Sequence, residues 1–169
     1  MSKNEAPMGN GTSLSGTSTT KILFVCFGNI CRSPMAEFVL KDMVQKAGLT
    51  DRFTIASAAV SHVSVGKAVH PPAAEKLASV GISAEGKISR QLTPEDYSNY
   101  DLLIGMDHSN IQGMQELFGG DPERKIHMLL TYANRDDEVA DPWYTGDFET
   151  TYSDVLEGCT ALLQHLTNN

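Results

Sequence analysis

Residues 25–34 have the sequence Val-Cys-Phe-Gly-Asn-Ile-Cys-Arg-Ser-Pro. The apolar run 22–25 is typical of a buried strand, and the residues from Pro34 onward follow a helical pattern. This context predicts a strand, a tight loop and a helix in succession. Such a loop turns its backbone N–H groups inward beside a helix N-terminus, where they bind anions. The sequence therefore predicts an anion-binding loop with Cys26 at its mouth.

The side chains of this loop suit an attack on a phosphate group. Inward N–H dipoles, a neighbouring arginine and a helix N-terminus favour the thiolate form of Cys26, which is the nucleophilic form. Arg32 carries a planar guanidinium that binds two phosphate oxygens at once, which a lysine does not do. Ser33 can hydrogen-bond the thiolate and assist its later departure. Gly28 and Asn29 tolerate the positive φ angles that we expect in such a loop.

Simpler interpretations of the loop are disfavoured by its composition. A single cysteine after a strand is most often a packed core residue, but here a strand, two cysteines, Gly-Asn, Arg-Ser and a proline occur together. A Walker A loop is excluded because no Gly-Lys-Ser/Thr follows a glycine run. A zinc site is disfavoured because the chain has only one further cysteine, Cys159. We expect no metal and no cofactor.

The overall composition sets limits on the function. The chain has 169 residues, of which 41% are hydrophobic and 20% charged, enough for one domain with a sizeable core. The net charge of −8 disfavours nucleic acid binding, which needs clustered Lys and Arg. Three cysteines form no disulfide framework, so we expect a reducing compartment, the cytoplasm. No apolar run is long enough to span a membrane, so we expect no membrane partner.

Residues 1–20 differ from the rest of the chain, because they are rich in Ser, Thr, Gly and Asn and nearly lack large apolar groups. We expect a disordered tail there and a single domain over residues 21–169. Strands are predicted at 21–25, 53–57, 101–106 and 126–130, and helices at 34–47, 71–80, after an N-cap at Thr93, after an N-cap at Ser109, and at 148–166. This alternation predicts an α/β fold with a parallel sheet, in which ligands bind beyond the carboxyl ends of the strands. The oligomeric state is left open by the sequence, with a monomer favoured.

A second chemical element precedes the last predicted helix. A phenolate or alkoxide leaves faster when it receives a proton, so a thiolate needs a general acid as its partner. Asp141 stands in the sequence Asp-Pro-Trp-Tyr, where a proline stiffens the loop and two aromatic rings follow. Asp136 and Asp137 are rival acids, whereas we expect Asp147 to cap the last helix. Asp107, after the third predicted strand, either holds the loop from behind or caps the next helix.

Residues 26–34 resemble the signature loop of the low-molecular-weight protein tyrosine phosphatases, a Cys-x-Gly-Asn-x-Cys-Arg-Ser-Pro run after the first strand. The match is complete at every fixed position, and the family carries an Asp-Pro-aromatic-aromatic loop where Asp141 stands. The resemblance covers residues 21–169 and implies a flavodoxin-like, three-layer α/β/α fold with a four-stranded parallel sheet. It implies hydrolysis of phosphotyrosine, in proteins or small aryl phosphates. Cys26 would form a cysteinyl phosphate, Arg32 would hold the phosphate, and Asp141 would act first as acid and then as base.

The resemblance also assigns roles to neighbouring residues. The phosphate would be bound by Phe27, Gly28, Asn29, Ile30, Cys31, Arg32 and Ser33. The loop would be supported by Asn29, Ser33 and Ser57. The substrate ring would lie between Phe27, Val63, Trp143 and Tyr144. The family often has an aromatic residue where Val63 stands, so this departure bears on the depth and selectivity of the pocket. His62 and His70 are further candidates for the wall of the pocket, but solvated surface positions are favoured for both.

The other two cysteines have separate expected roles. In the resembled family, a second cysteine in the loop can close a reversible disulfide onto the nucleophile, and Cys31 is in place to pair with Cys26. The physical reason is that a thiol oxidised first is then captured before irreversible oxidation. Cys159 falls on the apolar face of the last predicted helix, so we expect it to pack in the core.

Three alternative functions differ from tyrosine dephosphorylation. Arsenate reductase shares the fold and the loop, but it needs a relay of further cysteines on a mobile segment, and only Cys159 remains. Phosphoarginine phosphatases tend to have Thr at the position of Ile30. A non-catalytic phosphopeptide-binding module would be expected to have lost the nucleophile or the acid, and both candidates are present here.

Overall fold

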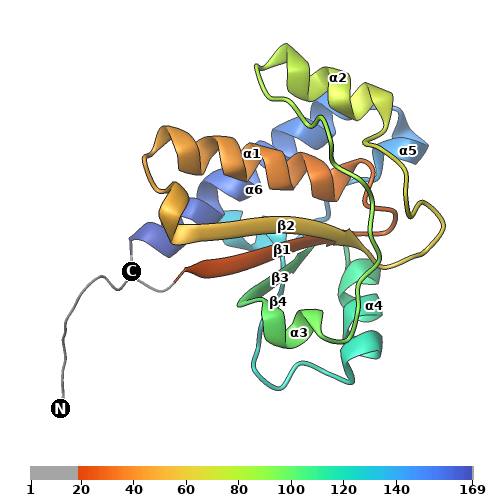
Figure 1. Cartoon of the computed structure of the whole chain (residues 1–169), viewed down its shortest axis with the longest axis vertical. Coiled ribbons are helices and arrows are strands. Elements are labelled where there is room, and N and C mark those ends of the chain that lie inside the picture. Colours follow the sequence, from red (N-terminus) through yellow and green to blue (C-terminus); the bar gives the residue numbers. More distant parts are fainter. Residues whose placement is uncertain (1–18, 169) are drawn as a thin grey trace.

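The computed structural model describes residues 19–168, which form a four-stranded parallel sheet with helices on both faces (Figure 1). The strands are β1 (Thr20–Cys26), β2 (Phe53–Ala59), β3 (Leu102–Gly105) and β4 (Ile126–Met128). Their spatial order is β2-β1-β3-β4. The register sets Cys26 opposite Ala59 of β2, and Val25 opposite Gly105 of β3. The predicted three-layer α/β/α, flavodoxin-like fold is confirmed.

Strand β1 is apolar on both faces because both faces are covered. Ile22 and Phe24 pack into the core cluster that includes α1 and α6, whereas Leu23 and Val25 pack into the cluster on the opposite face. All four are fully buried, which is why the strand is a continuous hydrophobic run instead of an alternating one. The chain continues from β1 to β2 on one side and returns to β3 on the other. The carboxyl end of β1 therefore lies at the switch point where ligands bind in such sheets.

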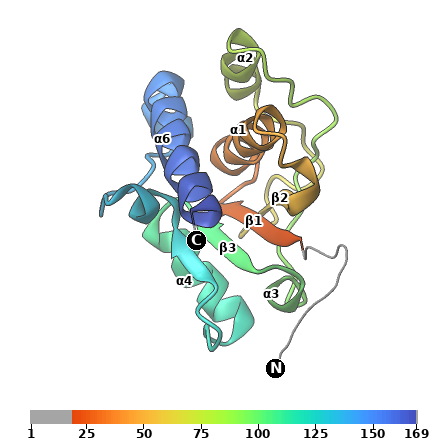
Figure 2. The same cartoon turned by 90° about the vertical axis from the view of Figure 1, so that its left-hand side faces the viewer.

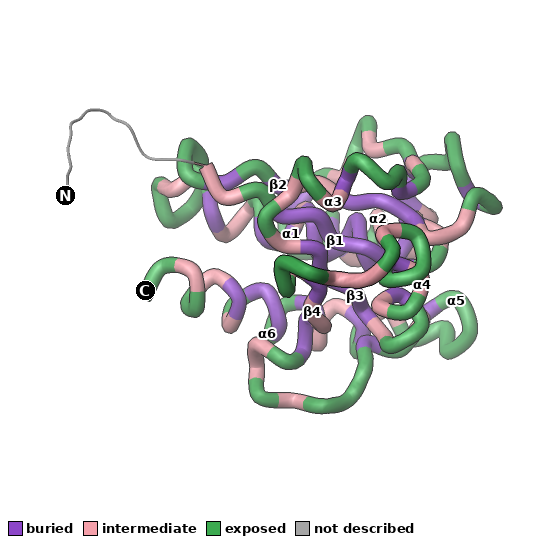
Figure 3. The backbone as a smooth tube through the Cα atoms, turned by 90° about the horizontal axis from the view of Figure 1, so that it is seen from below, coloured by how far each residue is buried: buried purple, intermediate pink, exposed green. Residues whose placement is uncertain are grey.

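Two long helices, α1 (Arg32–Lys46) and α6 (Phe148–Thr167), lie side by side over one face of the sheet, and α2 (Pro71–Ser79) packs against both (Figures 1 and 2). The opposite face carries α3 (Asp96–Asn99) and α4 (His108–Phe118). The remaining short helical segments are η1 (Thr50–Arg52), η2 (Leu129–Ala133) and α5 (Pro142–Thr145). Burial is concentrated in the strands and the inner sides of the helices, whereas α5 is mostly exposed (Figure 3).

Two helices begin at residues other than those predicted. Helix α1 starts at Arg32 instead of Pro34, because the end of the loop already has helical geometry. Pro34 still lies in the first turn, where backbone N–H groups have no acceptor within the helix. The N-cap of α4 is Asp107 instead of Ser109: its carboxylate accepts from the Asn110 amide at 2.9 Å. The Ser109 hydroxyl reinforces this cap by donating to Asp107 at 2.7 Å.

Other predicted boundaries shift for similar reasons. Helix α3 begins at Asp96 and its N-cap is Glu95, so the prediction of Thr93 as the N-cap was wrong; the Asp96 carboxylate instead accepts from the backbone N–H of Thr93 at 2.8 Å. Strand β4 ends at Met128, because the next two leucines turn into the core as part of η2. Residues 1–18 of the predicted tail lie outside the described residues, and Thr20 already belongs to β1. Among residues 19–168, no helix combines the length and hydropathy needed to cross a membrane.

Candidate active site

The loop between β1 and α1 surrounds the sulfur of Cys26. The backbone N–H groups of Asn29 and Ser33 donate to Sγ at 3.3 and 3.4 Å, and the Ser33 hydroxyl oxygen lies 3.0 Å from it. Cys26 is only 3% exposed, so few water molecules compete for the sulfur. Hydrogen-bond donors held around a sulfur in this way stabilise negative charge on it.

Backbone conformation in the loop matches the prediction at one residue and differs at the other. Asn29 has a φ of 57°, which is the left-handed conformation that asparagine tolerates best after glycine. Gly28 does not have a positive φ, so that expectation was wrong. Its position is instead set by its surroundings: its carbonyl accepts from the Ser89 hydroxyl at 2.9 Å, and an added Cβ would lie 3.4 Å from Oγ of Ser64.

Several backbone donors of the loop are available to a ligand. The amides of Gly28, Ile30, Cys31 and Arg32 have no acceptor within residues 19–168. From outside, the loop is held by the amide of His70, which donates to the carbonyl of Ile30 at 2.9 Å. A tetrahedral oxyanion such as phosphate supplies the acceptors that these amides lack.

The three residues predicted to support the loop are brought together by the structure. The side-chain NH₂ group of Asn29 donates to Oγ of Ser33 at 2.8 Å and to Oγ of Ser57 at 2.9 Å. Its carbonyl oxygen accepts from the backbone N–H of Arg90 at 3.3 Å. All three side chains are almost completely buried, so these bonds replace hydration and fix the loop from below.

Arg32 lies under the loop and connects it to two other segments. Its Nη1 donates to the Asp107 carboxylate at 2.7 Å and to the Val139 carbonyl at 3.0 Å, and its Nη2 lies 3.4 Å from the Asp141 carboxylate. Burial alone would lower the pKa of Arg32, but the charge of Cys26 and the hydrogen bond to Asp107 raise it. The guanidinium is therefore a fixed positive charge next to the sulfur.

Asp107 performs both of the roles between which the sequence did not decide. One carboxylate oxygen caps α4 and the other binds Arg32. Burial would raise the pKa of Asp107, but hydrogen bonds from Arg32, Ser109 and the Asn110 amide hold it below its usual value. The carboxylate thus stays ionised and holds the guanidinium in place.

The loop before α5 brings the carboxyl group of Asp141 into the same cavity as the sulfur. Oδ1 of Asp141 accepts from the Trp143 amide at 3.1 Å, so this residue caps the short helix that its proline begins. Its rival Asp137 pairs instead with Arg135 at 2.9 Å and is largely exposed. Asp136 does not line the pocket either. The expected cap by Asp147 is confirmed, since it accepts from the Thr150 amide at 2.9 Å.

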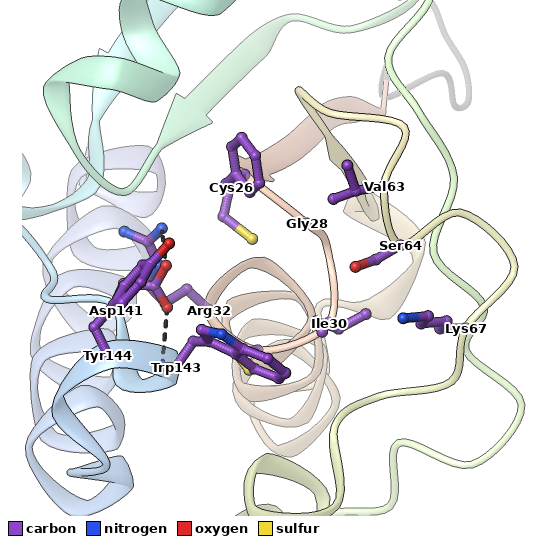
Figure 4. A pocket seen from close by; sticks show the side chains of 12 residues that line it. Cys26, Gly28, Ile30, Arg32, Val63, Ser64, Lys67, Asp141, Trp143 and Tyr144 are labelled. Carbon is purple, nitrogen blue, oxygen red and sulfur yellow. Dashed lines mark hydrogen bonds and ion pairs between the residues drawn. The ribbon is translucent and has the colours of Figure 1, made fainter.

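These groups line one open cavity of about 270 Å³ (Figure 4). Its lining residues are Cys26, Phe27, Gly28, Ile30, Cys31, Arg32, Val63, Ser64, Lys67, Asp141, Trp143 and Tyr144. Figure 4 shows the sulfur between two walls, with Trp143 and Tyr144 on one side and Val63, Ser64 and Lys67 on the other. Val63 and Trp143 are each 58% exposed and Tyr144 is 83% exposed, so the mouth of the pocket is apolar and accessible.

Three residues at this pocket were missed or misjudged from sequence. Ser64 and Lys67 line the wall next to Val63, and only their proximity in sequence to that residue could have indicated it. His70 was expected to be a solvated surface residue, but its ring lies 4.9 Å from the ring of Trp143 and 6.0 Å from that of Phe148. The reason is that its backbone, bound to the loop, places the ring against the aromatic wall.

The two remaining thiols occupy different surroundings. Cys31 lines the pocket but is mostly buried, and burial raises the pKa of its thiol to about 12. Cys159 is fully buried in α6, where its thiol donates to the carbonyl of Ala36 at 3.7 Å. Burial also raises the pKa of Cys159, and the prediction that it packs in the core is confirmed.

Fold and site together define an α/β protein whose loop between the first strand and the first helix surrounds a buried cysteine with amides and an arginine. Residues 21–169 match the family model described as low molecular weight phosphotyrosine protein phosphatase, and the chain belongs to this family. It is 38% identical to the low molecular weight protein-tyrosine-phosphatase YfkJ of Bacillus subtilis over 84% of this chain and 92% of that protein. The corresponding values for the low molecular weight phosphotyrosine protein phosphatase of Sus scrofa are 36%, 86% and 95%.

Solved structures share the fold of this chain. The crystal structure of YfkJ from Bacillus subtilis superposes with a TM-score of 0.86 and 37% identity, covering 89% of this chain and 96% of that one. The structure of a Drosophila arginine phosphatase superposes with a TM-score of 0.81 and 32% identity, covering 88% and 98%.

Proposed function

We propose that the protein hydrolyses phosphotyrosine in protein substrates, and aryl phosphates generally, through a cysteinyl phosphate on Cys26. The observation that carries the proposal is the convergence in one cavity of a buried sulfur, a ring of free amides, a buried guanidinium and a carboxyl group. Each of these groups has a place in a two-step phosphoryl transfer, and none needs a metal or a cofactor.

In the first step, the thiolate of Cys26 attacks phosphorus, and the bond between phosphorus and the aryl oxygen breaks. The loop amides and Arg32 bind the three equatorial oxygens, whose charge increases in the transition state. Asp107 and the Val139 carbonyl occupy Nη1 of Arg32, so the phosphate would bind to Nε and to Nη2, whose contact with Asp141 at 3.4 Å it would replace. Asp141, in its protonated form, gives its proton to the leaving oxygen.

In the second step, the carboxylate of Asp141 takes a proton from a water molecule, whose oxygen attacks phosphorus. The bond between sulfur and phosphorus breaks, the thiolate returns to Cys26, and inorganic phosphate leaves. Hydrogen bonds from Ser33 and from the Asn29 amide stabilise this departing thiolate. The same hydrogen-bond donors therefore stabilise the sulfur of Cys26 both when it attacks as the nucleophile and when it departs as the leaving group.

The walls of the pocket favour a flat aromatic substrate. Trp143 and Tyr144 on one side and Val63 on the other, together with Phe27, present large exposed apolar surfaces to a ring seated above the phosphate. Because Val63 is smaller than an aromatic residue, its wall leaves room for chains that flank the phosphorylated side chain. The substrate that we propose is therefore a phosphotyrosine-containing protein. We further propose that the enzyme is a monomer and that it works in a reducing compartment such as the cytoplasm.

Arginine dephosphorylation is the nearest alternative, since the Drosophila structure of this fold carries that description. Ile30 lines the pocket where phosphoarginine enzymes tend to have Thr, and its apolar side chain favours an aryl group over a guanidinium. Arsenate reduction is opposed by Cys159, which is fully buried and has no route to carry a disulfide outward. Measuring kcat/KM of wild type and of Ile30→Thr on matched phosphotyrosine and phosphoarginine peptides distinguishes tyrosine dephosphorylation from arginine dephosphorylation.

A second role is proposed for Cys31, as the partner of Cys26 under oxidation. Peroxide would convert the Cys26 thiolate to a sulfenic acid with release of hydroxide, and the Cys31 thiol would then displace water to form a disulfide. Both residues line the same cavity. Without Cys31, a second equivalent of peroxide would oxidise the sulfenic acid to a sulfinic acid, which dithiothreitol does not reduce. After treatment with excess peroxide, wild-type protein should therefore regain more activity with dithiothreitol than Cys31→Ser protein; equal recovery of the two would contradict this role.

Hydrolysis of p-nitrophenyl phosphate in the presence of EDTA tests the proposed function. Cys26→Ser should abolish activity, and Asp141→Asn should reduce it strongly. Activity that survives Cys26→Ser would overturn the proposal. Activity lost in Cys26→Ser but unchanged in Asp141→Asn would keep the thiolate and assign the acid role to another group.

A further inference from the structure

A buried carboxylate lies behind the phosphate loop, outside the pocket. Glu37, in the second turn of α1, is only 4% exposed. Its Oε1 accepts from the Ser57 hydroxyl at 2.6 Å, and its Oε2 accepts from Nζ of Lys41 at 2.6 Å. Nζ of Lys87 lies 3.4 Å from Oε1. A buried charge destabilises a fold unless it is paired and hydrogen-bonded, so this arrangement calls for an explanation.

Lys87 holds the same serine from a second direction. Its Nζ donates to the backbone carbonyl of Ser57 at 2.9 Å while it faces Glu37. Burial lowers the pKa of Lys87, and the neighbouring Glu37 opposes that shift. Ser57 is therefore fixed at its hydroxyl by a carboxylate and at its carbonyl by an ammonium group.

The charge of Glu37 determines which atoms donate along the chain of hydrogen bonds that follows. An ionised carboxylate can only accept, so Ser57 gives its single hydroxyl hydrogen to Glu37. The Ser57 oxygen is then an acceptor for the NH₂ group of Asn29, whose second hydrogen goes to the Ser33 oxygen. Ser33 keeps its own hydroxyl hydrogen, and the sulfur of Cys26, 3.0 Å away, is its acceptor.

If the hydrogen bonds ran in the opposite direction, they would disfavour the thiolate form of Cys26. If the Asn29 amide were reversed, its carbonyl would take the Ser33 hydrogen, and Cys26 would have to be the donor, as a neutral thiol. The Arg90 amide favours the same orientation as Glu37 does, because it donates to the Asn29 carbonyl at 3.3 Å. The orientation of one asparagine thus couples a buried carboxylate to the reactive sulfur.

We propose that Glu37 is a positioning residue for the phosphatase reaction: its negative charge orients the Ser57–Asn29–Ser33 hydrogen bonds so that they end in a donor to the Cys26 sulfur. This inference rests on the proposed role of Cys26 as nucleophile. Glu37 touches neither the substrate nor the sulfur and acts through the three residues between them. Its effect applies to both steps, because sulfur carries negative charge when it attacks and when it leaves.

Other charged and titratable groups face the two ends of this chain. Arg32, Asp141 and the Cys31 thiol lie near the sulfur, Lys41 and Lys87 lie next to Glu37, and Arg90 lies near Lys87. The variants that test the inference leave all six in place. A change in the reactivity of the sulfur can then be assigned to the hydrogen-bond chain instead of to a lost neighbour.

The test is the pH dependence of alkylation of Cys26 by iodoacetamide, followed by mass spectrometry of the peptide that contains it. In Glu37→Leu the chain loses its terminal acceptor, and the midpoint of reactivity should move to higher pH by about one unit. Glu37→Gln can still present an oxygen to Ser57 but lacks the charge that makes the group an acceptor only, so its midpoint should lie between those of wild type and Glu37→Leu. Asp42→Asn, which removes the exposed pair with Lys46 on the same helix, is the matched control and should not move it.

A double variant distinguishes an effect through Ser33 from a general loss of structure. Ser33→Ala should raise the midpoint by itself, and adding Glu37→Leu should then change it no further. An unchanged midpoint in Glu37→Leu, or shifts that simply add, would overturn the inference. If Glu37→Leu does not fold, Ser57→Ala interrupts the same chain and gives the same test. Alkylation needs no phosphatase activity, so failure here differs from failure of the proposed function, which Cys26→Ser reports.

Discussion

The floor and the mouth of the pocket are built in opposite ways. At the floor, Cys26, Arg32 and Ser33 are at most 3% exposed, and their polar atoms are hydrogen-bonded to each other, to the loop, to the N-cap of α4 and to the segment before α5. At the mouth, Trp143 and Tyr144 are 58% and 83% exposed, and they project from a helix of only four residues. The floor is fixed by many hydrogen bonds, whereas the aromatic residues at the mouth have few contacts that hold them.

This difference assigns separate tasks to the two regions. Groups that stabilise developing charge must be held in position before the reaction, because reorganising them would cost part of the energy that they supply. Groups that contact a variable protein substrate need surface area more than fixed geometry. Substitutions at the floor should therefore change the rate of chemistry, whereas substitutions at the mouth should change how substrates are chosen.

The largest effect among floor substitutions that keep the thiol is expected for Arg32→Lys. A lysine keeps a positive charge but loses the planar fork that holds Asp107, the Val139 carbonyl and two phosphate oxygens together. We expect kcat on p-nitrophenyl phosphate to fall on the order of 10³-fold. A fall of less than about tenfold would show that a point charge is sufficient and that the geometry of the floor is not decisive.

Asp141→Asn should have the next largest effect, with a distinct dependence on pH. Wild-type activity requires an ionised Cys26, which is lost as pH falls, and a protonated Asp141, which is lost as pH rises, so the profile should be bell-shaped on the acid side of neutral. The variant should lose roughly 10²-fold in kcat together with the descending limb at higher pH. Measuring both profiles with p-nitrophenyl phosphate checks this; a variant that keeps the descending limb would contradict the assignment.

Asp107→Asn should give a smaller loss, about tenfold in kcat, because asparagine still caps α4 but no longer offers a charged partner to Arg32. The pKa of Asp107 is lowered in the folded protein from its ordinary value of 3.8. Its ionised form thus stabilises the fold above about that pH, and this contribution is lost as pH falls through the lowered folded value. Urea unfolding at neutral and strongly acidic pH should show a weaker pH dependence in the variant, and an identical dependence would contradict the role.

The smallest effects are expected at the mouth. Trp143→Ala should raise KM for phosphotyrosine peptides several-fold, as expected for the loss of one ring contact, and should leave the reaction of p-nitrophenyl phosphate nearly unchanged in kcat. His70→Ala should reproduce part of this effect, since its ring packs against Trp143. Steady-state kinetics on both substrates measure the split. A loss in kcat as large as that of Asp141→Asn would show that the mouth takes part in the chemistry.

Sequence reasoning succeeded where the signal is local in the chain. The order of strand, loop and helix around Cys26, the parallel sheet and the core role of Cys159 follow from runs of neighbouring residues, and the structure has all three. Asp141 was singled out because proline and two aromatic residues follow it. The structure places it in the same cavity as Cys26, although the two lie far apart in sequence.

The groups that sequence reasoning missed depend on contacts across the fold. Glu37 is an ordinary helix residue in the sequence, and only the packing of α1 on β2 sets its carboxylate against Ser57. Lys87 reaches the same site from the segment after α2. His70 resembled a solvated residue because nothing near it in sequence predicts that it contacts Trp143. Such residues become visible only when the topology has fixed which segments meet.

The central claim, a covalent phosphate on Cys26, is tested most directly by trapping it. Asp141→Asn protein mixed with p-nitrophenyl phosphate should be quenched in acid within the first turnover, digested and analysed by mass spectrometry, because hydrolysis of the intermediate is slow without the base. The account predicts a phosphate adduct on the peptide that contains Cys26, with a matching burst of p-nitrophenol. Release of p-nitrophenol with no adduct on that peptide, or an adduct on another residue, would contradict it.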